Sequence, residues 1–564
     1  MPAPSVPFDR GQMLRRLEHE QFDVLVVGGG ITGAGVALDA ATRGLRTALI
    51  ERDDLASGTS SKSSKLVHGG LRYLQQGEVR LVYEALRERQ RLRKNAPHLV
   101  SVMPFMIPIL GKPGADQETT SVVHRKVARA LGSAMWMYDL TGGWRIGKLH
   151  RRLNRAAALA HMPTMPADRV LAAYLYFDAA VDDARLVLTV ARTAAAHGAA
   201  VATRCAAIDV LRDGDGSSSV SGLVVEADGR RFPVRARVVV NAAGVWSDEV
   251  RAIDEGADPD GIRPAKGVHL TVPWERVRND IAVVIPVPKD RRSLFVVPWG
   301  PRPDGTFRHT YVGTTDTDYR GPLDDPPCTA DDVAYVLRAL NASVVPADGR
   351  PITAGDVTGA WAGLRPLVKS DASGRTADLS RRHRITRSAQ GVVTVTGGKL
   401  TTYREMAEDT VDEVLSVLGR DARCRTRRQR LVGAGSPGRG DDPDLFARHG
   451  AESRSVLALA AGDPALLEPL VPGLAYRRVE AVWAVRHEMA TTLDDVLSRR
   501  TRARLADRDA AAAAAEDVAR LIAPHLGWDD DDIAREVASF RRSCAEEAAA
   551  MHVPEPAPAD PQPT

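Results

Sequence analysis

One glycine-rich turn near the beginning of the chain constrains its fold more than any other feature. Residues 28–33 read Gly-Gly-Gly-Ile-Thr-Gly, which fits the pattern G-x-G-x-x-G. The apolar run at residues 22–27 predicts a buried parallel strand before this turn, and the Ala-rich segment after it, to about residue 43, predicts a helix. Residues 46–50 predict a second strand. Together these elements predict a βαβ unit at the start of the protein.

The spaced glycines of this turn suit the binding of a pyrophosphate. Gly28 allows the tight turn, Gly30 lets the backbone approach the phosphates, and Gly33 permits close packing of the helix on the strand. The phosphates would lie at the helix N-terminus, where N–H groups and the helix dipole favour an anion. Glu51 ends the second strand, 18 positions after Gly33, where a ribose-binding carboxylate is expected. The unit is therefore predicted to bind a dinucleotide.

Two later segments favour FAD over NAD as this dinucleotide. Residues 238–244 predict another strand that enters a tight turn, and residues 395–402 predict a strand, two glycines and a polar entry to a helix. Contacts so widely separated along the chain suit a large cofactor that is buried along its length. Residues 433–438 also fit G-x-G-x-x-G, but no βαβ unit flanks them, so we interpret them as a linker loop. Direct use of NAD(P)H is therefore not expected.

Charge and cysteine content argue against several other classes of protein. The 76 basic and 72 acidic residues nearly cancel, which argues against a nucleic-acid protein with a large basic surface. The four cysteines have neither CxxC nor metal-ligand spacing, so we expect no disulfide framework and no metal site. The sequence contains no secretory signal and no run of about 18 uncharged apolar residues. A cytoplasmic location is therefore expected, with any membrane contact peripheral.

The length of 564 residues predicts more than one domain. We expect a polar lead-in at residues 1–20, a discontinuous cofactor-binding domain with an interleaved substrate region at 21–425, a helical domain at 426–552, and a disordered Pro-rich tail at 553–564. Further strands are expected at residues 236–240 and 392–396, and a hairpin loop at residues 213–221. Within the helical domain, residues 479–497 carry apolar side chains every three or four positions, which predicts one amphipathic helix.

Several motifs together resemble the signatures of FAD-dependent glycerol-3-phosphate dehydrogenases. They lie in family order at residues 60–74 (SSKSSKLVHGGLRYL), 241–246 (NAAGVW), 313–316 (GTTD), 363–366 (GLRP), 397–404 (GGKLTTYR) and 485–490 (VRHEMA). The resemblance implies an α/β fold, with a Rossmann-like FAD-binding domain, an antiparallel sheet over the flavin as the substrate (cap) region, and a C-terminal helical domain. It also implies oxidation of sn-glycerol 3-phosphate to dihydroxyacetone phosphate, with electrons passed to a membrane quinone.

The glycine motif and the resemblance together give a set of expected FAD contacts. They are Gly28, Gly30, Ile31, Thr32, Gly33, Glu51, Arg52, Thr59, Ser60, Ser64, Lys65, Leu66, His68, Gly69, Gly70, Ala242, Gly244, Trp246, Thr315, Gly398, Lys399, Leu400 and Thr401.

A phosphorylated substrate requires cationic side chains in the site. Arginine is suited to a phosphate dianion because its guanidinium binds two oxygens at once. Arg72, Arg365 and Lys399 occupy family positions that would surround the substrate, with Tyr73 and Thr401 as hydrogen-bond partners. Each of the three cations lies inside an apolar or Gly-rich motif, where a buried charge needs a partner.

Oxidation of a secondary alcohol moves a hydride from C2 to flavin N5 and releases the hydroxyl proton. His269 is our first candidate for the base, because an unperturbed histidine pKa near 6.5 suits proton abstraction near neutrality. A neutral core histidine bonded to backbone is the alternative reading of His269. His68 is a rival whose motif points instead to flavin contact, and Arg365 could polarise the C2 oxygen as the proton leaves.

Residues 122–149 combine apolar and aromatic side chains with five basic ones. Such a segment either lies at an anionic membrane surface or packs on the core as a helix whose arginines reach out to solvent. Three other functions remain open: an oxidase that delivers the electrons to oxygen, an amine or amino-acid oxidase on the same scaffold, and a flavin-binding regulator without turnover. The block match disfavours the amine oxidase. A homodimer is also left open.

Overall fold

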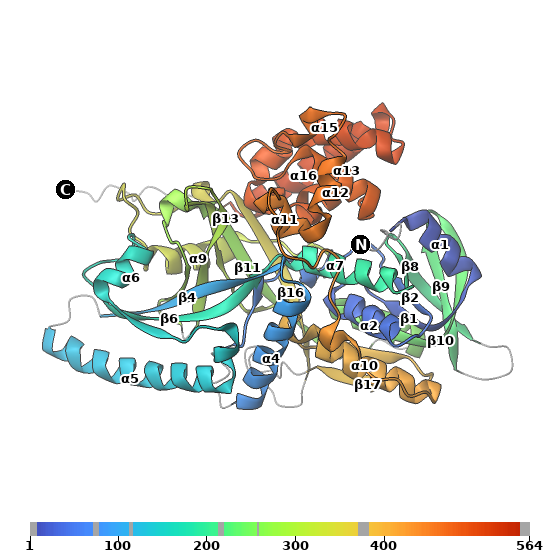
Figure 1. Ribbon diagram of the computed structural model, residues 1–564, viewed down its shortest axis with the longest axis horizontal. Coiled ribbons are helices and arrows are strands. Elements are labelled where there is room, and N and C mark those ends of the chain that lie inside the picture. Colours follow the sequence, from blue (N-terminus) through green and yellow to red (C-terminus); the bar gives the residue numbers. More distant parts are fainter. Residues whose placement is uncertain are drawn as a thin grey trace, which may run out of the picture.

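The computed structural model describes residues 8–70, 78–111, 117–212, 219–256, 259–290, 292–369 and 383–552, with side chains from residue 129 onward in the third of these ranges. Three parts are visible: a sheet with helices at the right of Figure 1, a second large sheet at the left, and a group of C-terminal helices above both.

The first sheet contains the predicted βαβ unit. Its strands are β1 (Gln21–Val27), β2 (Thr47–Ile50), β7 (Ala200–Ala202), β8 (Ala206–Arg212), β9 (Val220–Ala227), β10 (Arg230–Asn241), β17 (Arg384–Arg387) and β18 (Val393–Thr396). The main order is β17-β18-β10-β1-β2-β7, and β1 runs parallel to both of its neighbours. Parallel neighbours bring the carboxyl ends of β1, β2, β10 and β18 to one edge, which is where open α/β sheets bind ligands.

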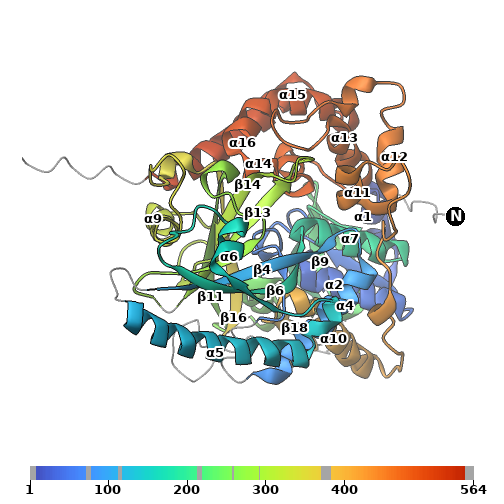
Figure 2. The same ribbon diagram turned by 60° about the vertical axis from the view of Figure 1, so that its left-hand side comes forward.

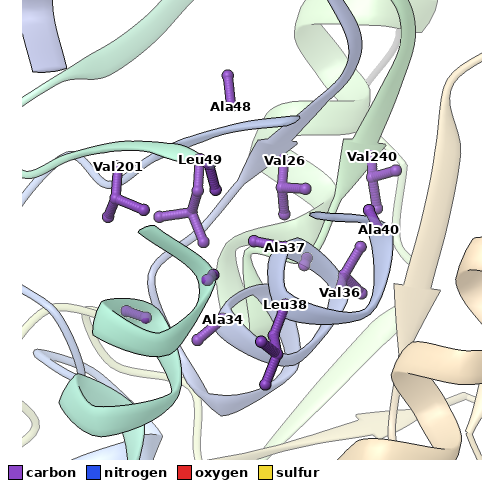
Figure 3. Packing of buried hydrophobic residues seen from close by; sticks show 14 of the residues in the cluster. Val26, Ala34, Val36, Ala37, Leu38, Ala40, Ala48, Leu49, Val201 and Val240 are labelled. Atoms are coloured by element: carbon purple, nitrogen blue, oxygen red, sulfur yellow. The ribbon is translucent and has the colours of Figure 1, made fainter. Parts of the chain in front are cut away.

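Small residues let helices pack closely on this sheet. Ala34, Ala37 and Ala40 of α2 (Ile31–Thr42) share a buried cluster with Val26 of β1 and Leu49 of β2, and Figure 3 shows this packing. The helix lies between α7 (Asp183–Ala196) and α10 (Tyr403–Leu418). It is enclosed by apolar contacts, so its N-terminus is held in a fixed place.

The second sheet is mostly antiparallel. Its strands are β3 (Leu66–Val67), β4 (Val100–Leu110), β5 (Arg151–Asn154), β6 (Val170–Val181), β11 (Ile262–Pro273), β12 (Ala282–Pro286), β13 (Ser293–Pro301), β14 (Phe307–Gly313), β15 (Thr317–Asp318) and β16 (Gly359–Val368). Successive side chains of β4 point to opposite faces of the sheet, as in any β-strand. Phe105 packs with α4 (Val79–Asn95) and α5 (Gln117–Thr141), whereas Met106 packs with α6 (Arg155–His161) and α9 (Ala330–Asn341).

The remaining helices are α1 (Arg10–His19), α8 (Ser247–Glu255), α11 (Pro443–His449), α12 (Ser453–Ala458), α13 (Arg478–His487), α14 (Ala503–Ala506), α15 (Arg508–Leu526) and α16 (Asp530–Ala550). Those from α11 onward form the upper group in Figures 1 and 2. The predicted boundary near residue 425 falls in the segment between α10 and α11. The limits of the domains stay a prediction, and the tail at residues 553–564 lies outside the described residues.

The single helix expected at residues 479–497 is wrong. α13 ends at His487, and a π-helix, η11 (Asp495–Arg500), follows after a break. Two features of the break explain it. Glu488 is fully buried and accepts hydrogen bonds from Arg185 and Trp483, and Met489 has a left-handed φ of 57°. A helix cannot continue through a left-handed residue.

Most other expected elements are confirmed. The expected strands correspond to β1, β2, β10 and β18, and the expected first helix to α2. The predicted hairpin loop joins the antiparallel strands β8 and β9, although residues 213–218 of it lie outside the described residues. Residues 433–438 form a loop without a βαβ unit, as interpreted.

Candidate functional site

A cavity opens at the carboxyl ends of β1, β2, β10 and β18, with about 1170 Å³ of empty space that includes open solvent at its mouth. Of the predicted cofactor contacts, the residues that line it are Gly28, Gly30, Ile31, Thr32, Glu51, Arg52, Thr59, Ser60, Ala242, Gly244, Trp246, Gly398, Lys399 and Leu400. Four separate segments of the sequence therefore meet at one edge of the first sheet.

The glycines of the first turn are sterically required. Gly28 has a φ of 110°, a conformation that L side chains rarely adopt. A Cβ on Gly33 would lie 1.9 Å from the carbonyl oxygen of Gly28, so only glycine lets α2 approach the strand this closely. Gly30 is the N-cap of α2, and the Ser60 hydroxyl accepts a hydrogen bond from the N–H of Ile31 at 3.0 Å. The first turn of the helix thus faces the cavity, where its N–H groups suit an anion.

Glu51 helps to hold the turn in place. Its Oε2 accepts a hydrogen bond from the backbone N–H of Gly29 at 2.6 Å, and its Oε1 accepts one from Asp53 at 2.9 Å. Burial raises the pKa of the Glu51 carboxyl. The carboxylate lines the cavity as well, so it can also accept a ribose hydroxyl, which stays a prediction.

Trp246 also lines the cavity. The Arg52 guanidinium stacks over its ring at 4.8 Å from the centroid. The buried indole Nε1 has no hydrogen-bond partner among the described residues, and an unpaired buried donor is unfavourable. A helix N-terminus that lines the cavity, a glycine cradle and an unpaired donor together fit a dinucleotide.

A second group of residues lies where the two sheets meet. The segment at residues 59–65 leaves the cavity and runs to the second sheet, where the Ser64 Oγ is 2.9 Å from Nε2 of His269. Tyr311 donates a hydrogen bond from its hydroxyl to the Ser64 carbonyl at 3.0 Å. The structure therefore brings Ser64 and His269 together, although the sequence separates them by 205 positions.

His269 is almost entirely buried. Strand pairing places it opposite Trp361, and the two rings stack at 4.9 Å. Only 2% of its surface is exposed, and Nδ1 has no hydrogen-bond partner among the described residues. Burial, helped by the nearby cations Lys65 and Arg365, lowers the pKa of His269 well below 6.5. The ring is therefore neutral at physiological pH, and its bonded partner is a side chain rather than backbone.

Arg365 lies on the same face of β16 as Trp361, four positions further along. Its guanidinium donates to Asp316 at 2.9 Å, to the Thr314 hydroxyl at 3.1 Å and to the Thr315 carbonyl at 3.2 Å. The side chain remains 25% exposed. A cation that is held by fixed partners and still reaches solvent can receive an anionic ligand.

The other predicted residues have diverse positions. Thr401 Oγ1 accepts a hydrogen bond from the backbone N–H of His68 at 3.3 Å. The backbone N–H of Gly69 donates to the Asp178 carboxylate, and Gly70 has a left-handed φ of 73°. Thr315 Oγ1 accepts a hydrogen bond from the backbone N–H of Val268. Gly33, Ser64, Lys65, Leu66, His68, Gly69, Gly70, Thr315 and Thr401 do not line the cavity. Arg72 and Tyr73 lie outside the described residues.

Three residues at this place were not predicted from the sequence. Trp361 stacks on His269. Asp183, which is fully buried, binds Lys65 and Ser63, and Arg502 of the C-terminal part binds Asp183. A signal for Trp361 was available, because residues 361, 363 and 365 of a strand share one face. Nothing in the sequence pairs Arg502 with Asp183.

Two family models match the chain. One, described as FAD dependent oxidoreductase, matches residues 23–407, and the other, described as C-terminal domain of alpha-glycerophosphate oxidase, matches residues 424–533.

Individual relatives agree with these models. Glycerol-3-phosphate dehydrogenase 2 of Mycobacterium tuberculosis is 39% identical, and the match covers 98% of this chain and 93% of that one. Glycerol-3-phosphate dehydrogenase of Mycobacterium leprae has the same identity and coverage. Among solved structures, the glycerol-3-phosphate dehydrogenase from Bacillus halodurans complexed with FAD matches with a TM-score of 0.74 and 29% identity, over 96% of this chain and 97% of that one.

Proposed function

The chain belongs to the family of FAD-dependent glycerol-3-phosphate dehydrogenases, and from this premise we propose that it oxidises sn-glycerol 3-phosphate to dihydroxyacetone phosphate. Bound FAD supplies the acceptor for the hydride that leaves C2. The observation that supports the proposal most is Arg365, a fixed and partly exposed cation next to the neutral His269.

Substrate binding is assigned to the cations of the site. Arg365 presents a guanidinium whose orientation is fixed by Asp316 and Thr314, so it can bind a substrate oxygen without losing much side-chain freedom. Lys399 lines the cavity beside Gly398. Arg72 and Tyr73 complete this set through the family resemblance alone.

We propose that His269 is the base that accepts the proton of the C2 hydroxyl. The neutral ring can accept a proton, but at 2% exposure it does not face open space. Ser64 is hydrogen-bonded to its Nε2, so the hydroxyl of Ser64 can pass the proton on to the ring. Arg365 would stabilise the oxygen while the proton leaves.

Anaerobic mixing of the purified holoenzyme with glycerol 3-phosphate tests the reaction. Loss of the oxidised-flavin absorbance in a single turnover is expected. Glycerol, which has no phosphate, serves as the control and should leave the spectrum unchanged. A flavin that stays oxidised with both compounds would refute the proposed reaction.

The electron acceptor needs its own test, because an oxidase performs the same first half-reaction. We propose that the electron acceptor is a membrane quinone, as the resemblance of the sequence motifs to the family implies. Oxygen readmitted to the reduced enzyme should restore the oxidised spectrum slowly and with little peroxide, whereas a soluble quinone analogue should restore it promptly. Prompt peroxide formation would favour the oxidase.

An exposed apolar face is the proposed contact with the membrane. Its residues are Val79, Tyr83, Trp136, Met137, Leu140, Trp144 and Leu149, which are 42–77% exposed and which we call the docking face. They belong to α4, α5 and the segment after α5, and these three elements contact one another. Helix α5 lies near the bottom of the molecule in Figures 1 and 2. Clustered exposed apolar groups of this kind mark an interaction site.

Basic side chains around the docking face favour an anionic lipid surface. Arg129, Lys148, Arg151 and Arg152 are exposed beside it, and the Arg145 guanidinium lies 5.0 Å from the ring centroid of Tyr83 and 5.2 Å from that of Trp144. Aromatic and basic groups together suit the headgroup region. Among the helices that the structure describes, none is both long and apolar enough to cross a bilayer.

Co-sedimentation with anionic phospholipid vesicles tests this contact. Leu140→Glu should weaken partitioning about tenfold, since a buried leucine contributes about 1.5–3 kcal/mol. Leu467→Glu, at an exposed apolar position of the C-terminal part, is the matched control and should bind like the unsubstituted protein. Equal binding by both variants would contradict the docking face. A position on the cytoplasmic side of the membrane and a homodimer both stay predictions.

A further inference from the structure

One short segment of the C-terminal part, residues 499–502, contacts two stretches of the connection between β2 and β3, and this connection lines part of the cofactor cavity. The first contact is with the loop after β2. Arg500 binds Asp54 through Nη1 at 2.6 Å and Nη2 at 2.7 Å, and Arg499 binds the same carboxylate through Nε at 2.6 Å. Asp54 is 1% exposed and follows Arg52 and Asp53, which line the cavity.

The second contact is with the loop at residues 57–65. Arg502, whose side chain is 1% exposed, donates to Asp182 at 3.1 Å and also binds Asp183. Asp183 in turn accepts hydrogen bonds from the backbone N–H and the hydroxyl of Ser63 at 3.0 and 2.7 Å, and from Lys65 at 3.1 Å. One buried carboxylate therefore joins Arg502 to two residues of the loop.

The loop carries this connection to the reacting groups. Its beginning, at Ser57 to Ser60, lines the cofactor cavity, and its end places Ser64 on His269. Lys65 Nζ lies 4.6 Å from the ring centroid of Trp361, and Trp361 stacks on His269. The path from Arg502 through Asp183 to His269 consists of direct contacts only.

We propose that Arg502 is a positioning residue of the dehydrogenase: it holds Asp183, and through it the loop at residues 57–65, so that Ser64 and His269 stand correctly to the cofactor and substrate. The C-terminal helical part is then a component of the active site, although Arg502 does not line the cofactor cavity. This inference rests on the proposed function, because it assigns Ser64 and His269 to that reaction.

Because Arg502 is charged, it also affects the pKa of the neighbouring Lys65, which an uncharged packing residue would not do. Burial and the nearby Arg502 lower the pKa of Lys65 to about 8, against the attraction of Asp182 and Asp183. Among the described residues, His269 also lies close enough to interact with Lys65, and its ring is neutral. Loss of Arg502 removes a cation from this group, so the pKa of Lys65 should rise.

The experiment compares Arg502→Gln with Arg504→Gln in the holoenzyme. Arg504 is the matched control because its hydrogen-bond partners, Asp494, Ser543 and Glu547, all belong to the C-terminal part. Arg502→Gln should retain FAD but reduce the flavin about 10- to 100-fold more slowly, the cost expected from a small misplacement of reacting groups. The Lys65 cation holds Asp183 and lies against Trp361, so its deprotonation should slow flavin reduction and produce an alkaline break in the pH profile. This break should move above 8 in Arg502→Gln, whereas the profile of Arg504→Gln should not change.

A second readout does not need the substrate. The visible absorption and fluorescence of the bound flavin, recorded without glycerol 3-phosphate, should change in Arg502→Gln and not in Arg504→Gln. Identical spectra and pH profiles in the two variants would overturn the positioning role. An unsubstituted enzyme that fails to respond to glycerol 3-phosphate would overturn the proposed function, and the spectra would still decide on Arg502.

A milder variant covers the case in which Arg502→Gln does not fold. Ser63→Ala removes one hydrogen bond to Asp183 from the loop side and leaves Arg502 in place. It should slow flavin reduction in the same direction, by about two- to tenfold, which corresponds to the net contribution of a typical hydrogen bond. Rates and spectra equal to those of the unsubstituted enzyme would refute the inference.

Discussion

The two halves of the site are built in different ways. The cofactor cavity is formed by backbone at strand ends, and its first turn, Gly28 to Gly33, lies within one βαβ unit. The cluster around His269 is formed by side chains from β11, β16, the loop at residues 57–65 and the C-terminal part. The glycine turn can thus form from local geometry, whereas the cluster needs residues from distant parts of the chain.

This difference predicts how each half responds to substitution. A change in the glycine turn should affect cofactor binding itself, because the surrounding packing leaves the backbone no room to shift. A change in the cluster should leave the cofactor bound and affect the rate or its pH dependence.

Gly33→Ala should nearly abolish FAD binding. The added Cβ would stand 1.9 Å from the Gly28 carbonyl oxygen, and α2 cannot retreat because it is packed between α7 and α10. We expect more than about 100-fold weaker binding together with a loss of about 1–3 kcal/mol of stability. Flavin absorbance retained after gel filtration measures the first effect, and urea unfolding the second.

Gly462→Ala is the control for this substitution. A Cβ at Gly462 meets no atom within 4 Å, so cofactor content and stability should stay as they are. If Gly33→Ala kept its flavin as well, the turn would be more adaptable than its geometry indicates, and the division between the two halves would fail.

Arg365→Ala should retain FAD and slow flavin reduction by at least about 30-fold, since truncation of a hydrogen-bonded charge commonly costs about 2–5 kcal/mol. Rapid mixing with glycerol 3-phosphate measures the rate, and the flavin-to-protein ratio checks the retention. Arg231→Ala, an exposed arginine of β10 that pairs with Glu226, should behave like the unsubstituted enzyme. A loss of FAD in Arg365→Ala would assign this residue to the cavity instead.

The same division explains what the sequence could predict. The turn, Glu51 and the strands around them were predictable because a glycine motif and an alternation of apolar segments act over about 30 residues. The contact of His269 with Trp361 depends on the pairing of β11 with β16, and the contact of Arg502 with Asp183 on the docking of a separate helical part. No local pattern specifies such distant partners, and the left-handed Met489 likewise interrupted a helix that periodicity alone favoured.

Glu51→Gln sharpens the description of the cavity with a smaller effect. In the unsubstituted protein, the two carboxylate oxygens of Glu51 accept one hydrogen bond each, from the backbone N–H groups of Gly29 and Asp53. A glutamine amide has only one acceptor oxygen, so one of these N–H groups loses its partner. Loss of one charged acceptor should weaken FAD binding about tenfold. Titration of the apoprotein with FAD measures the affinity. Glu20→Gln, at the end of α1, is the control, and an unchanged affinity in Glu51→Gln would exclude any role of the charge.

The smallest effect concerns the pH dependence of flavin reduction. A histidine base of ordinary pKa would lose half of its active form at about pH 6.5. Burial instead lowers the pKa of His269 well below this value, so the rate should change less than about twofold between pH 7 and 6.

The same shift affects stability with a defined sign. A ring whose folded pKa is lowered stabilises the protein fully above the unfolded value of about 6.5, and this contribution is lost as the pH falls below it. Stopped-flow reduction and urea unfolding at each pH measure the two properties, and His269→Phe should make stability less sensitive to acid. A rate that halves near pH 6.5 in the unsubstituted enzyme would mean that the ring opens to solvent during the reaction. The cluster would then be as adaptable as a surface site.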